Sequence, residues 1–276
     1  MKKYFFLACL SAFALIACKK KAPVENTPAK DTTQVAQVKI DSLAFEVDTF
    51  HVVETEKDCG KGDCATFDSY YEKIRKPLLP VHDSVNRYVD SFMVSTMRGI
   101  GYDAGAFDLA KVGKNFIKMA TSDEYADVGT LDWSSHSTII RPVNEIISVS
   151  SSCGGYTGGA HGNYYIEVVN FFTSNGKLVK MENLFNDTAA LNKLGLKYFK
   201  KDNQIDEKTD LEEAGWFVSD QSFYLNNNFD ITMDAITWQY NPYEIGPYVM
   251  GDASVTIPMK ELQKYLKVKL TDVVIQ

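Results

Sequence analysis

Alternating apolar and polar residues mark the beginning of the part of the chain that can build a core. Leu43, Phe45 and Val47 fall on one side of such a run. A period of two residues is typical of a half-buried strand, and it predicts one strand over about 42–55 and a second over about 65–74. The short stretch between them would join the two strands into a hairpin.

A period of 3.6 residues replaces this alternation in four places. The expected helices cover about 81–97, 106–120, 188–200 and 259–266. Asp187 precedes the third helix and can accept a hydrogen bond from its first turn, and Pro258 suits the start of the fourth. In the second helix, the side chains expected to point inward are Phe107, Ala110, Phe116 and Ile117.

The remaining apolar runs predict further strands. They lie at about 131–149, 164–172, 177–181, 223–225, 229–233, 236–238 and 249–257. Between the second and third of these runs, Asn175-Gly176 is a pair that favours a tight hairpin turn. Helices interspersed among hairpins predict an α+β fold with a mainly antiparallel sheet and several packed helices.

Nine residues between two of these strands contain five glycines. The segment runs from Gly154 to Gly162 (GGYTGGAHG), after the apolar run 145–149 and before the run 164–169. Glycine reaches the positive-φ conformations of tight turns and lets another backbone approach closely. A closely packed turn would explain the five glycines, and so would a surface where a ligand or a second chain segment lies against bare backbone.

The first 17 residues have the composition of a lipoprotein signal peptide. Two lysines precede an apolar stretch, residues 4–16, that is too short to span a bilayer as a permanent helix. The sequence LIAC at residues 15–18 is similar to a lipobox, in which Cys18 is acylated and becomes the mature N-terminus. We expect a flexible tether over 18–38 and a single α+β domain over 39–276, made of an N-terminal segment, 39–150, and a C-terminal segment, 151–276.

Export changes the charge of the protein. The whole sequence holds 29 basic and 36 acidic residues, a formal net charge of −7. Residues 1–38 contain six lysines and two acidic residues, so the charge without them is −11. Such an acidic body argues against nucleic acid or an anionic membrane surface as a partner of the folded part, and it suits a basic protein.

Three cysteines remain after loss of Cys9 and acylation of Cys18. Cys59 and Cys64 enclose four residues, two of them glycine, which in an oxidising compartment predicts a small disulfide loop. Zinc would need two further ligands and there is no second cysteine pair, so no metal site is expected. Cys153 is expected to be a buried small apolar residue, because no His-Asn or His-Asp pair can be assigned to it.

Two separated segments together resemble a known family. The first is Tyr156–Gly162 with Phe171-Phe172 and Asn183-Leu184-Phe185; the second is Pro242–Tyr248 with Gly251, Ile257-Pro258 and Glu261-Leu262. They resemble the start and the close of a bacterial extracellular domain of unknown function. That domain forms the C-terminus of RsiV-type anti-sigma factors, which sense lysozyme, and lies beside the catalytic domain of PdaC-type peptidoglycan deacetylases. The resemblance covers roughly 40–270 and implies one α+β unit, without the signalling or deacetylase activity of those proteins.

The same two segments carry the candidate binding residues. Tyrosine rings offer flat amphipathic faces to sugars or to a protein anchor, and glycine exposes backbone N–H and C=O groups. The expected binding residues are Tyr156, Thr157, Gly158, Gly159, His161, Tyr243, Glu244 and Tyr248. With the resemblance and the negative charge, they predict a lipid-anchored cell-envelope binding protein, in the outer membrane of a Gram-negative bacterium, whose ligand is peptidoglycan-related or a lysozyme-type muramidase.

Fewer residues in the sequence suggest catalysis than binding. The chain has four histidines and no HExxH, P-loop or GxSxG motif, and no cofactor is expected. His161 and Glu244 would form an acid–base couple if the two segments meet in space, so a cell-wall hydrolase is the alternative function. A structural envelope lipoprotein is a further alternative. Exposure of both segments in one patch would favour binding.

Overall fold

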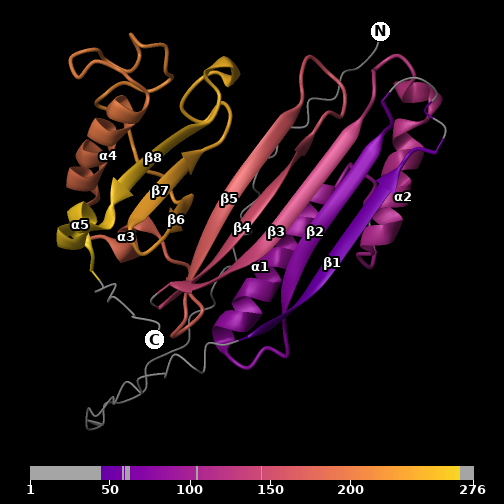
Figure 1. Ribbon diagram of the computed structural model, residues 1–276, viewed down its shortest axis with the longest axis horizontal. Helices are drawn as coiled ribbons and strands as arrows, with labels where there is room; N and C mark the ends of the chain where they lie inside the picture. Colours follow the sequence, from indigo (N-terminus) through magenta and orange to yellow (C-terminus); the bar gives the residue numbers. More distant parts are fainter. Residues whose placement is uncertain (1–44, 58, 60–62, 104, 144, 268–276) are drawn as a thin grey trace, which may run out of the picture. The chain divides into compact units, whose positions relative to one another are not determined.

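The computed structural model describes residues 45–57, 59, 63–103, 105–143 and 145–267, all within one compact unit, Val38–Gln276. The expected signal peptide, Cys18 and the tether lie outside the described residues. Figure 1 shows the strands and helices of this unit. They are β1 (Glu46–Thr55), β2 (Thr66–Arg75), α1 (Pro80–Met97), α2 (Leu109–Ala120), β3 (Asp132–Val143), β4 (Ile146–Gly155), β5 (Asn163–Phe172), α3 (Met181–Leu184), α4 (Thr188–Asp202), β6 (Phe229–Ile231), β7 (Ala235–Tyr240), β8 (Ala253–Pro258) and α5 (Met259–Leu262).

The α+β class is confirmed, with the strands divided between two sheets. Five strands pair in the order β1-β2-β3-β4-β5, and three in the order β6-β7-β8. Every pair is antiparallel except β2–β3. That pair is parallel because α1 and α2 lie between the two strands in the chain and form a crossover, which a parallel connection requires.

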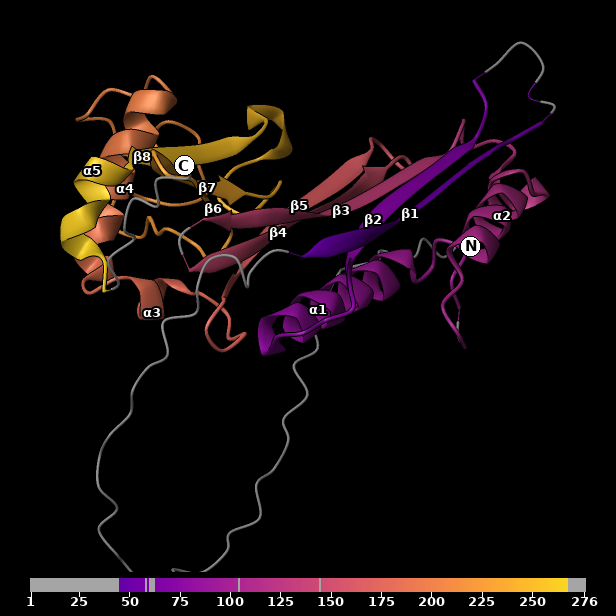
Figure 2. The ribbon, with the colours of Figure 1, turned by 60° about the horizontal axis from the view of Figure 1, so that its bottom comes forward.

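The helix α1 and the helix α2 pack on the same face of the five-stranded sheet (Figure 2). Val81, Val85, Val89 and Phe92 of α1 are buried there, as the helical period predicts. The inward face of α2 was predicted wrongly in one position, because Ala110 is exposed and its neighbours Leu109 and Val112 are buried. The helix starts later than expected, after Asp108, whose carboxylate accepts a hydrogen bond from the Lys111 N–H at 3.2 Å. No helix in the described residues is long and apolar enough to cross a membrane.

Four predicted strands differ in the structure. The run 131–149 forms most of β3 and the start of β4, two strands that pair with each other. Residues 177–181 form a single bridge between Leu178 and Phe171 before α3 begins. Residues 223–225 are irregular, since the Leu225 N–H bonds to the Asn192 side chain at 3.0 Å and not to a strand. Residues 248–250 form a short 3₁₀ turn, so β8 begins only after Gly251. Val179 and Phe223 pack in the second core from irregular backbone, whereas Val249 and Met250 are exposed. The period of an apolar run reveals neither outcome.

The three-stranded sheet belongs to a second hydrophobic core, formed with α4 and α5 and centred on Trp238, Phe199 and Phe229. This core adjoins β5, an edge of the larger sheet, through two asparagine side chains. The Asn228 carboxamide accepts from the Val168 N–H and donates to the Ile166 carbonyl, both at 2.8 Å. The Asn241 carboxamide accepts from the Ile166 N–H at 2.7 Å and donates to the same carbonyl at 2.9 Å. Both amides thus take the place of a neighbouring strand.

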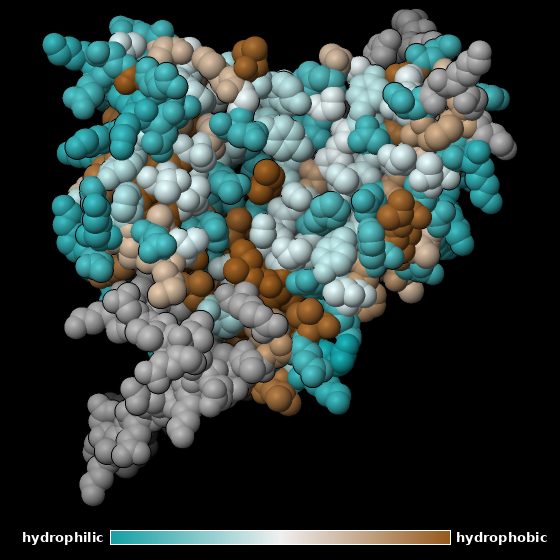
Figure 3. Space-filling model, in the orientation of Figure 1, coloured by the Kyte–Doolittle hydropathy of each residue, from teal (hydrophilic) through white to brown (hydrophobic). Residues whose placement is uncertain are grey.

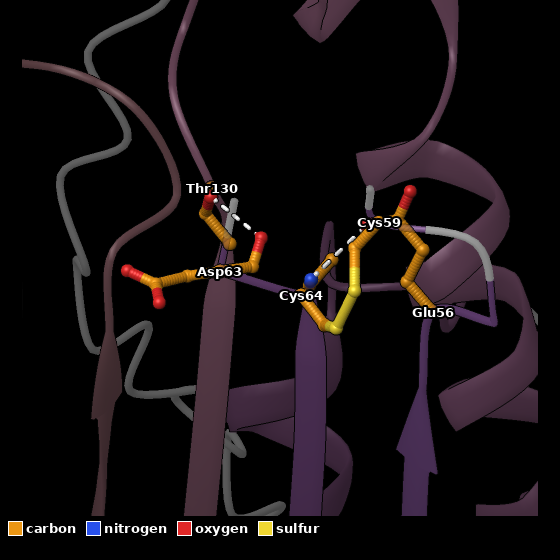
Figure 4. The surroundings of a disulfide bond; sticks show 6 residues. Glu56, Cys59, Asp63, Cys64 and Thr130 are labelled. Atoms are coloured by element: carbon orange, nitrogen blue, oxygen red, sulfur yellow. Dashed lines mark hydrogen bonds between the residues drawn. A yellow bond between two sulfur atoms is a disulfide. The ribbon is translucent and has the colours of Figure 1, made fainter. Parts of the chain in front are cut away.

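The predicted disulfide between Cys59 and Cys64 is present at the end of the β1–β2 hairpin (Figure 4). The Glu56 N–H donates to the Ala65 carbonyl at 2.9 Å, and the Glu56 carboxylate accepts from the Ala65 N–H at 3.2 Å. The Thr130 hydroxyl donates to the Asp63 carbonyl at 3.0 Å and ties the loop to the segment before β3. The disulfide therefore closes a hairpin whose partner strands are in register from end to end.

Candidate functional site

The glycine-rich segment joins β4 to β5, as predicted, and is pinned to β3. The Asp132 N–H donates to the Tyr156 carbonyl at 2.9 Å, and the Asp132 carboxylate accepts from the Tyr156 N–H at 3.3 Å. Gly155 has φ 153°, and a Cβ there would lie 2.1 Å from the Asp132 carbonyl oxygen. Close approach of backbone therefore explains this glycine. By contrast, Gly159 has φ 118° and nothing within 4 Å of a Cβ, so its conformation alone requires glycine.

Tyr156 holds this turn together. Its hydroxyl lies 3.0 Å from the Val128 carbonyl oxygen and 3.0 Å from that of Gly159, so a single donor is shared between the two. The ring is half-buried, while Thr157 is exposed and Gly158 half-buried. Tyr156 thus positions the turn, and the exposed residues of the turn lie after it.

His161 connects the two segments that were predicted to carry the site. Its Nδ1 lies 2.6 Å from the Gly162 carbonyl oxygen, which can only accept, so Nδ1 carries the proton. Its Nε2 lies 3.2 Å from the Tyr243 hydroxyl, within hydrogen-bond distance. The imidazole also stacks on the Tyr248 ring, with centroids 4.2 Å apart and planes at 23°.

Tyr164 and Asp252 complete this cluster, although neither was among the predicted binding residues. The Tyr164 hydroxyl donates to the Asp252 carboxylate, and its ring lies 6.3 Å from that of Tyr248. This hydrogen bond, with burial and the nearby negative charge, raises the pKa of Tyr164 to about 12. We call His161, Tyr164, Tyr243 and Tyr248 the aromatic cluster.

Tyr243 projects from the loop between β7 and β8, and its ring is 53% exposed. Its backbone has φ 67°, a conformation that few bulky residues adopt. Asn241 and Glu244 hold the loop in place. The Glu244 N–H donates to the Asn241 carbonyl at 3.0 Å, and the Asn241 N–H donates to the Glu244 carboxylate at 2.9 Å.

Glu244 consequently does not pair with His161. Its carboxylate accepts from the Asn241 N–H, from the Asn226 carboxamide at 2.8 Å and from the Tyr224 hydroxyl at 3.5 Å. The predicted acid–base couple is therefore not formed, and Glu244 shapes the loop that presents Tyr243. A carboxylate that satisfies backbone and amide donors is a structural group.

A hollow of about 420 Å³ lies beside the aromatic cluster. It is lined by residues of β3, β4 and β5, by the glycine-rich segment and by Tyr248. Ser134, Ser152, Gly154 and Gly155 are among the lining residues, and the Ser134 hydroxyl donates to the Gly154 carbonyl at 3.3 Å. In the described residues, no three His, Cys, Asp or Glu side chains are grouped to hold a metal ion.

Five of the eight predicted binding residues belong to the aromatic cluster, line the hollow or support the neighbouring loop. His161 and Tyr243 are exposed and meet the half-buried Tyr248, Tyr156 and Tyr248 line the hollow, and Glu244 supports a loop. Tyr164 was missed because it lies within a strand and carries no motif. The sequence could have indicated Tyr164 only by its position, two residues after Gly162 on the strand that follows the turn.

Comparison with known proteins finds one family that is similar to part of the chain. Residues 182–260 match DUF3298, a protein family of unknown function. The DUF3298 match includes α4 and the loop that carries Tyr243 and Tyr248, but not the glycine-rich segment. No curated protein matched the chain.

Two crystal structures of DUF3298 proteins share the fold. A family member from Bacteroides fragilis NCTC 9343 aligns with a TM-score of 0.59 and 22% identity, covering 82% of this chain and 94% of the other. A DUF3298 protein from Pseudomonas aeruginosa PAO1 aligns with a TM-score of 0.59 and 17% identity, covering 82% and 96%. At this identity the likeness concerns the fold, and it extends well beyond the 182–260 match.

Proposed function

We propose that this protein is a lipid-anchored cell-envelope protein that binds a peptidoglycan-related glycan at the aromatic cluster. The observation that supports the proposal most directly is the meeting of two distant segments at His161, which bonds to Tyr243 and stacks on Tyr248. The resemblance to the extracellular domain of RsiV-type and PdaC-type proteins points to the same cell-wall setting. The anchor rests on the lipobox-like sequence ending at Cys18.

The chemistry of the cluster suits a sugar ring. Tyrosine faces pack against the apolar C–H groups of a pyranose, while phenol, imidazole and carboxylate groups bond to its hydroxyls. Tyr243 and His161 are exposed, and the hollow next to Tyr248 has room for a further group. The Asp252 carboxylate, also exposed, adds an acceptor beside Tyr164.

Calorimetric titration with purified muropeptides tests this function. We expect Tyr248→Ala and Tyr243→Asn each to weaken binding about tenfold or more, which corresponds to about 1.4 kcal/mol. Asparagine tolerates the positive φ of position 243, so Tyr243→Asn removes the ring without adding backbone strain. Phe50→Ala is the matched control, because Phe50 is an exposed aromatic residue on β1, stacked on Tyr71 and remote in sequence from both segments. Equal affinity of all four proteins would refute the site.

A muramidase is the second candidate ligand, and two observations favour it. Val249 is 87% exposed and Met250 40% exposed, directly after Tyr248, which gives the cluster an apolar margin. The formal charge of −11 beyond residue 38 would attract a basic protein, with an association rate that falls as salt is added. Including lysozyme in the same titration separates the two ligands. Lysozyme binding without muropeptide binding would replace the glycan proposal.

A further inference from the structure

The face of the five-stranded sheet opposite α1 and α2 is accessible over β1–β3 and over the ends of β4 and β5 next to the aromatic cluster, whereas Ser148, Val168 and Asn170 are buried beside the second core. Along β3 the side chains alternate strictly between the two faces. Ser135 and Ser137 are 1% and 0% exposed toward the helices, whereas Ser134 and His136 are exposed on the other side. We call this second side the open face. In Figure 3 the surface over β1–β4 is mostly teal and pale, the colours of hydrophilic and intermediate residues, with some brown apolar patches.

The pairing register arranges polar side chains on the open face in two rows that cross the strands. His51, Tyr70, His136 and Ser152 are successive cross-strand partners from β1 to β4. They form the first row. Because cross-strand partners on one face lie side by side, this row is a continuous line of hydrogen-bonding groups.

The second row leads into the candidate site. Asp68, Ser134, Gly154 and Tyr164 are successive partners from β2 to β5. The last three also line the hollow, and Tyr164 belongs to the aromatic cluster. Strands lie about 4.8 Å apart, so crossing from β1 to β5 spans roughly 19 Å.

At the far end of the rows, one carboxylate lies between two imidazoles. Asp68 Oδ1 is 2.9 Å from His51 Nε2 and 3.9 Å from His136 Nε2. The His51 ring meets the Tyr70 ring edge-on with centroids 5.9 Å apart, and the Tyr70 hydroxyl donates to Glu72 at 2.7 Å. Both histidines and Asp68 are about half exposed. We call His51, Asp68 and His136 the His–Asp–His cluster.

The absence of basic side chains on the open face indicates which kind of extended ligand it can bind. The positions of this face that are not buried are alternate residues from Val47 to Thr55, Thr66 to Glu72, Asp132 to Ile140, Ser150 to Ser152 and Tyr164 to Ile166, and they include no lysine or arginine. A polyanion needs such cations, which rules against teichoic acid or nucleic acid on this face. Hydroxyls, imidazoles, carboxylates and tyrosine rings suit a chain that is neutral and rich in hydroxyl groups.

We infer that the ligand is a linear, neutral glycan that lies across the strands of the open face, from Tyr248 to the His–Asp–His cluster. This inference rests on the proposed function and adds to it that the cluster is a second contact, reached only by longer chains. A short sugar would occupy the aromatic cluster and the hollow alone. Binding should therefore strengthen with chain length until the far end is reached.

Titration of the full-length chain with N-acetylglucosamine oligomers of two and six sugars tests the inference. We expect the hexamer to bind the unmodified protein about tenfold more tightly than the dimer. In H51A/H136A, hexamer affinity should fall to that of the dimer, and dimer affinity should stay unchanged. H51Q/H136Q, which keeps polar side chains, serves as the second variant if the first unfolds.

The outcomes separate the two proposals. Dimer binding that is lost in Tyr248→Ala supports the proposed function by itself. A hexamer that binds no better than the dimer, or that keeps its advantage in both double variants, overturns the inference and leaves the proposed function standing. Absence of binding by either oligomer, with muropeptides also inactive, overturns both.

Discussion

Tyr243 shows at the residue scale how the candidate site is built. A tyrosine at φ 67° costs on the order of 1 kcal/mol relative to ordinary backbone. The reciprocal hydrogen bonds between Asn241 and Glu244 offset this cost and turn the ring outward. The conformation places the Tyr243 hydroxyl within 3.2 Å of His161 Nε2. A locally unfavourable backbone at an exposed ring is a feature of binding sites more than of cores.

The Tyr164–Asp252 pair makes a testable prediction about ionisation. The hydrogen bond favours the neutral phenol and raises the pKa of Tyr164 to about 12. The stability that this hydrogen bond gives to the folded protein is present below the ordinary tyrosine pKa of about 10. That stability is lost as the pH rises from 10 through 12. In Asp252→Asn the pKa should fall toward 10, because the negative charge is gone.

The measurement is an alkaline titration of the ultraviolet phenolate band. Subtracting the curve of Tyr164→Phe from that of its parent isolates this one residue among 15 tyrosines. The same subtraction is made in the Asp252→Asn background. A Tyr164 that titrates identically in both backgrounds would show that Asp252 does not hold the proton.

Residue types alone identified some members of the site and misassigned others. His161, Tyr243 and Tyr248 stood out because each lies in a segment dense in glycine or proline. Glu244 lies in the same segment, yet it bonds to Asn226 and Asn241, whose positions depend on the fold. Asp252 follows Gly251 without any pattern, and only the packing of β5 against the β7–β8 loop brings it to Tyr164.

At the scale of elements, asparagine side chains take over the role of a missing strand at the β5 edge. Asn228 and Asn241 together satisfy the N–H groups of Ile166 and Val168 and bond twice to the Ile166 carbonyl. An edge strand with bonded backbone groups is also protected from pairing with another chain. The second core is thereby attached to β5 through specific polar contacts as well as through packing.

We expect Asn228→Ala to lower the free energy of unfolding by about 2–3 kcal/mol. The substitution leaves a partly buried N–H of Val168 and a carbonyl of Ile166 with one partner fewer, and each loss costs about 1 kcal/mol or more. Urea denaturation measures the change. Gln221→Ala, which removes an exposed carboxamide outside the interface, should change stability by less than about 0.5 kcal/mol. Similar effects of the two substitutions would contradict the role given to Asn228.

Element prediction succeeded where local signals agreed with burial. The period of α1 and the Asp187 cap of α4 were sufficient. Residues 173–175 do form a turn, but no strand follows it directly. The prediction failed for 177–181 and 223–225, where apolar side chains enter the second core from irregular backbone. Asn227 and Asn192 bond to that backbone from distant parts of the chain, and such contacts leave no local pattern.

The whole unit contains two cores, one under α1 and α2 and one around Trp238. The class of the fold followed from alternating hairpins and helices. The division into two sheets did not, because a strand's pattern tells which face is buried and not which sheet it joins. The meeting of the two candidate segments likewise depends on the placement of the second core beside β5.

Acid should destabilise the unit through His82. This residue is 2% exposed in the first turn of α1, and burial lowers its pKa below the ordinary 6.5, with Asp83 opposing the shift. As the pH falls, His82 is therefore protonated in the unfolded chain at a higher pH than in the folded protein. The free energy of unfolding is highest above about pH 6.5 and decreases as the pH drops toward the pKa of His82 in the folded protein. Denaturation at about pH 7.5 and about pH 5.5 measures this loss.

His82→Leu isolates the contribution. The variant should lose less stability than the unmodified protein between the two pH values, because leucine does not titrate. The other described histidines, all exposed, remain in both proteins and cancel in the comparison. If both proteins lose the same stability between the two pH values, His82 is not the cause of the acid sensitivity.

The position of β1 has a mechanical consequence for a protein held by its N-terminus. If the chain is anchored through Cys18, as proposed, tension would enter the sheet at Glu46, where Arg75 forms ion pairs with Glu46 and Asp48. From there an edge strand peels one residue pair at a time, a far weaker arrangement than shearing a whole ladder at once. The Cys59–Cys64 bond lies beyond the last residue pair, Thr55 and Thr66, and shortens the connection between the two strands. A released β1 would therefore stay close to β2 and could pair with it again when the load ends.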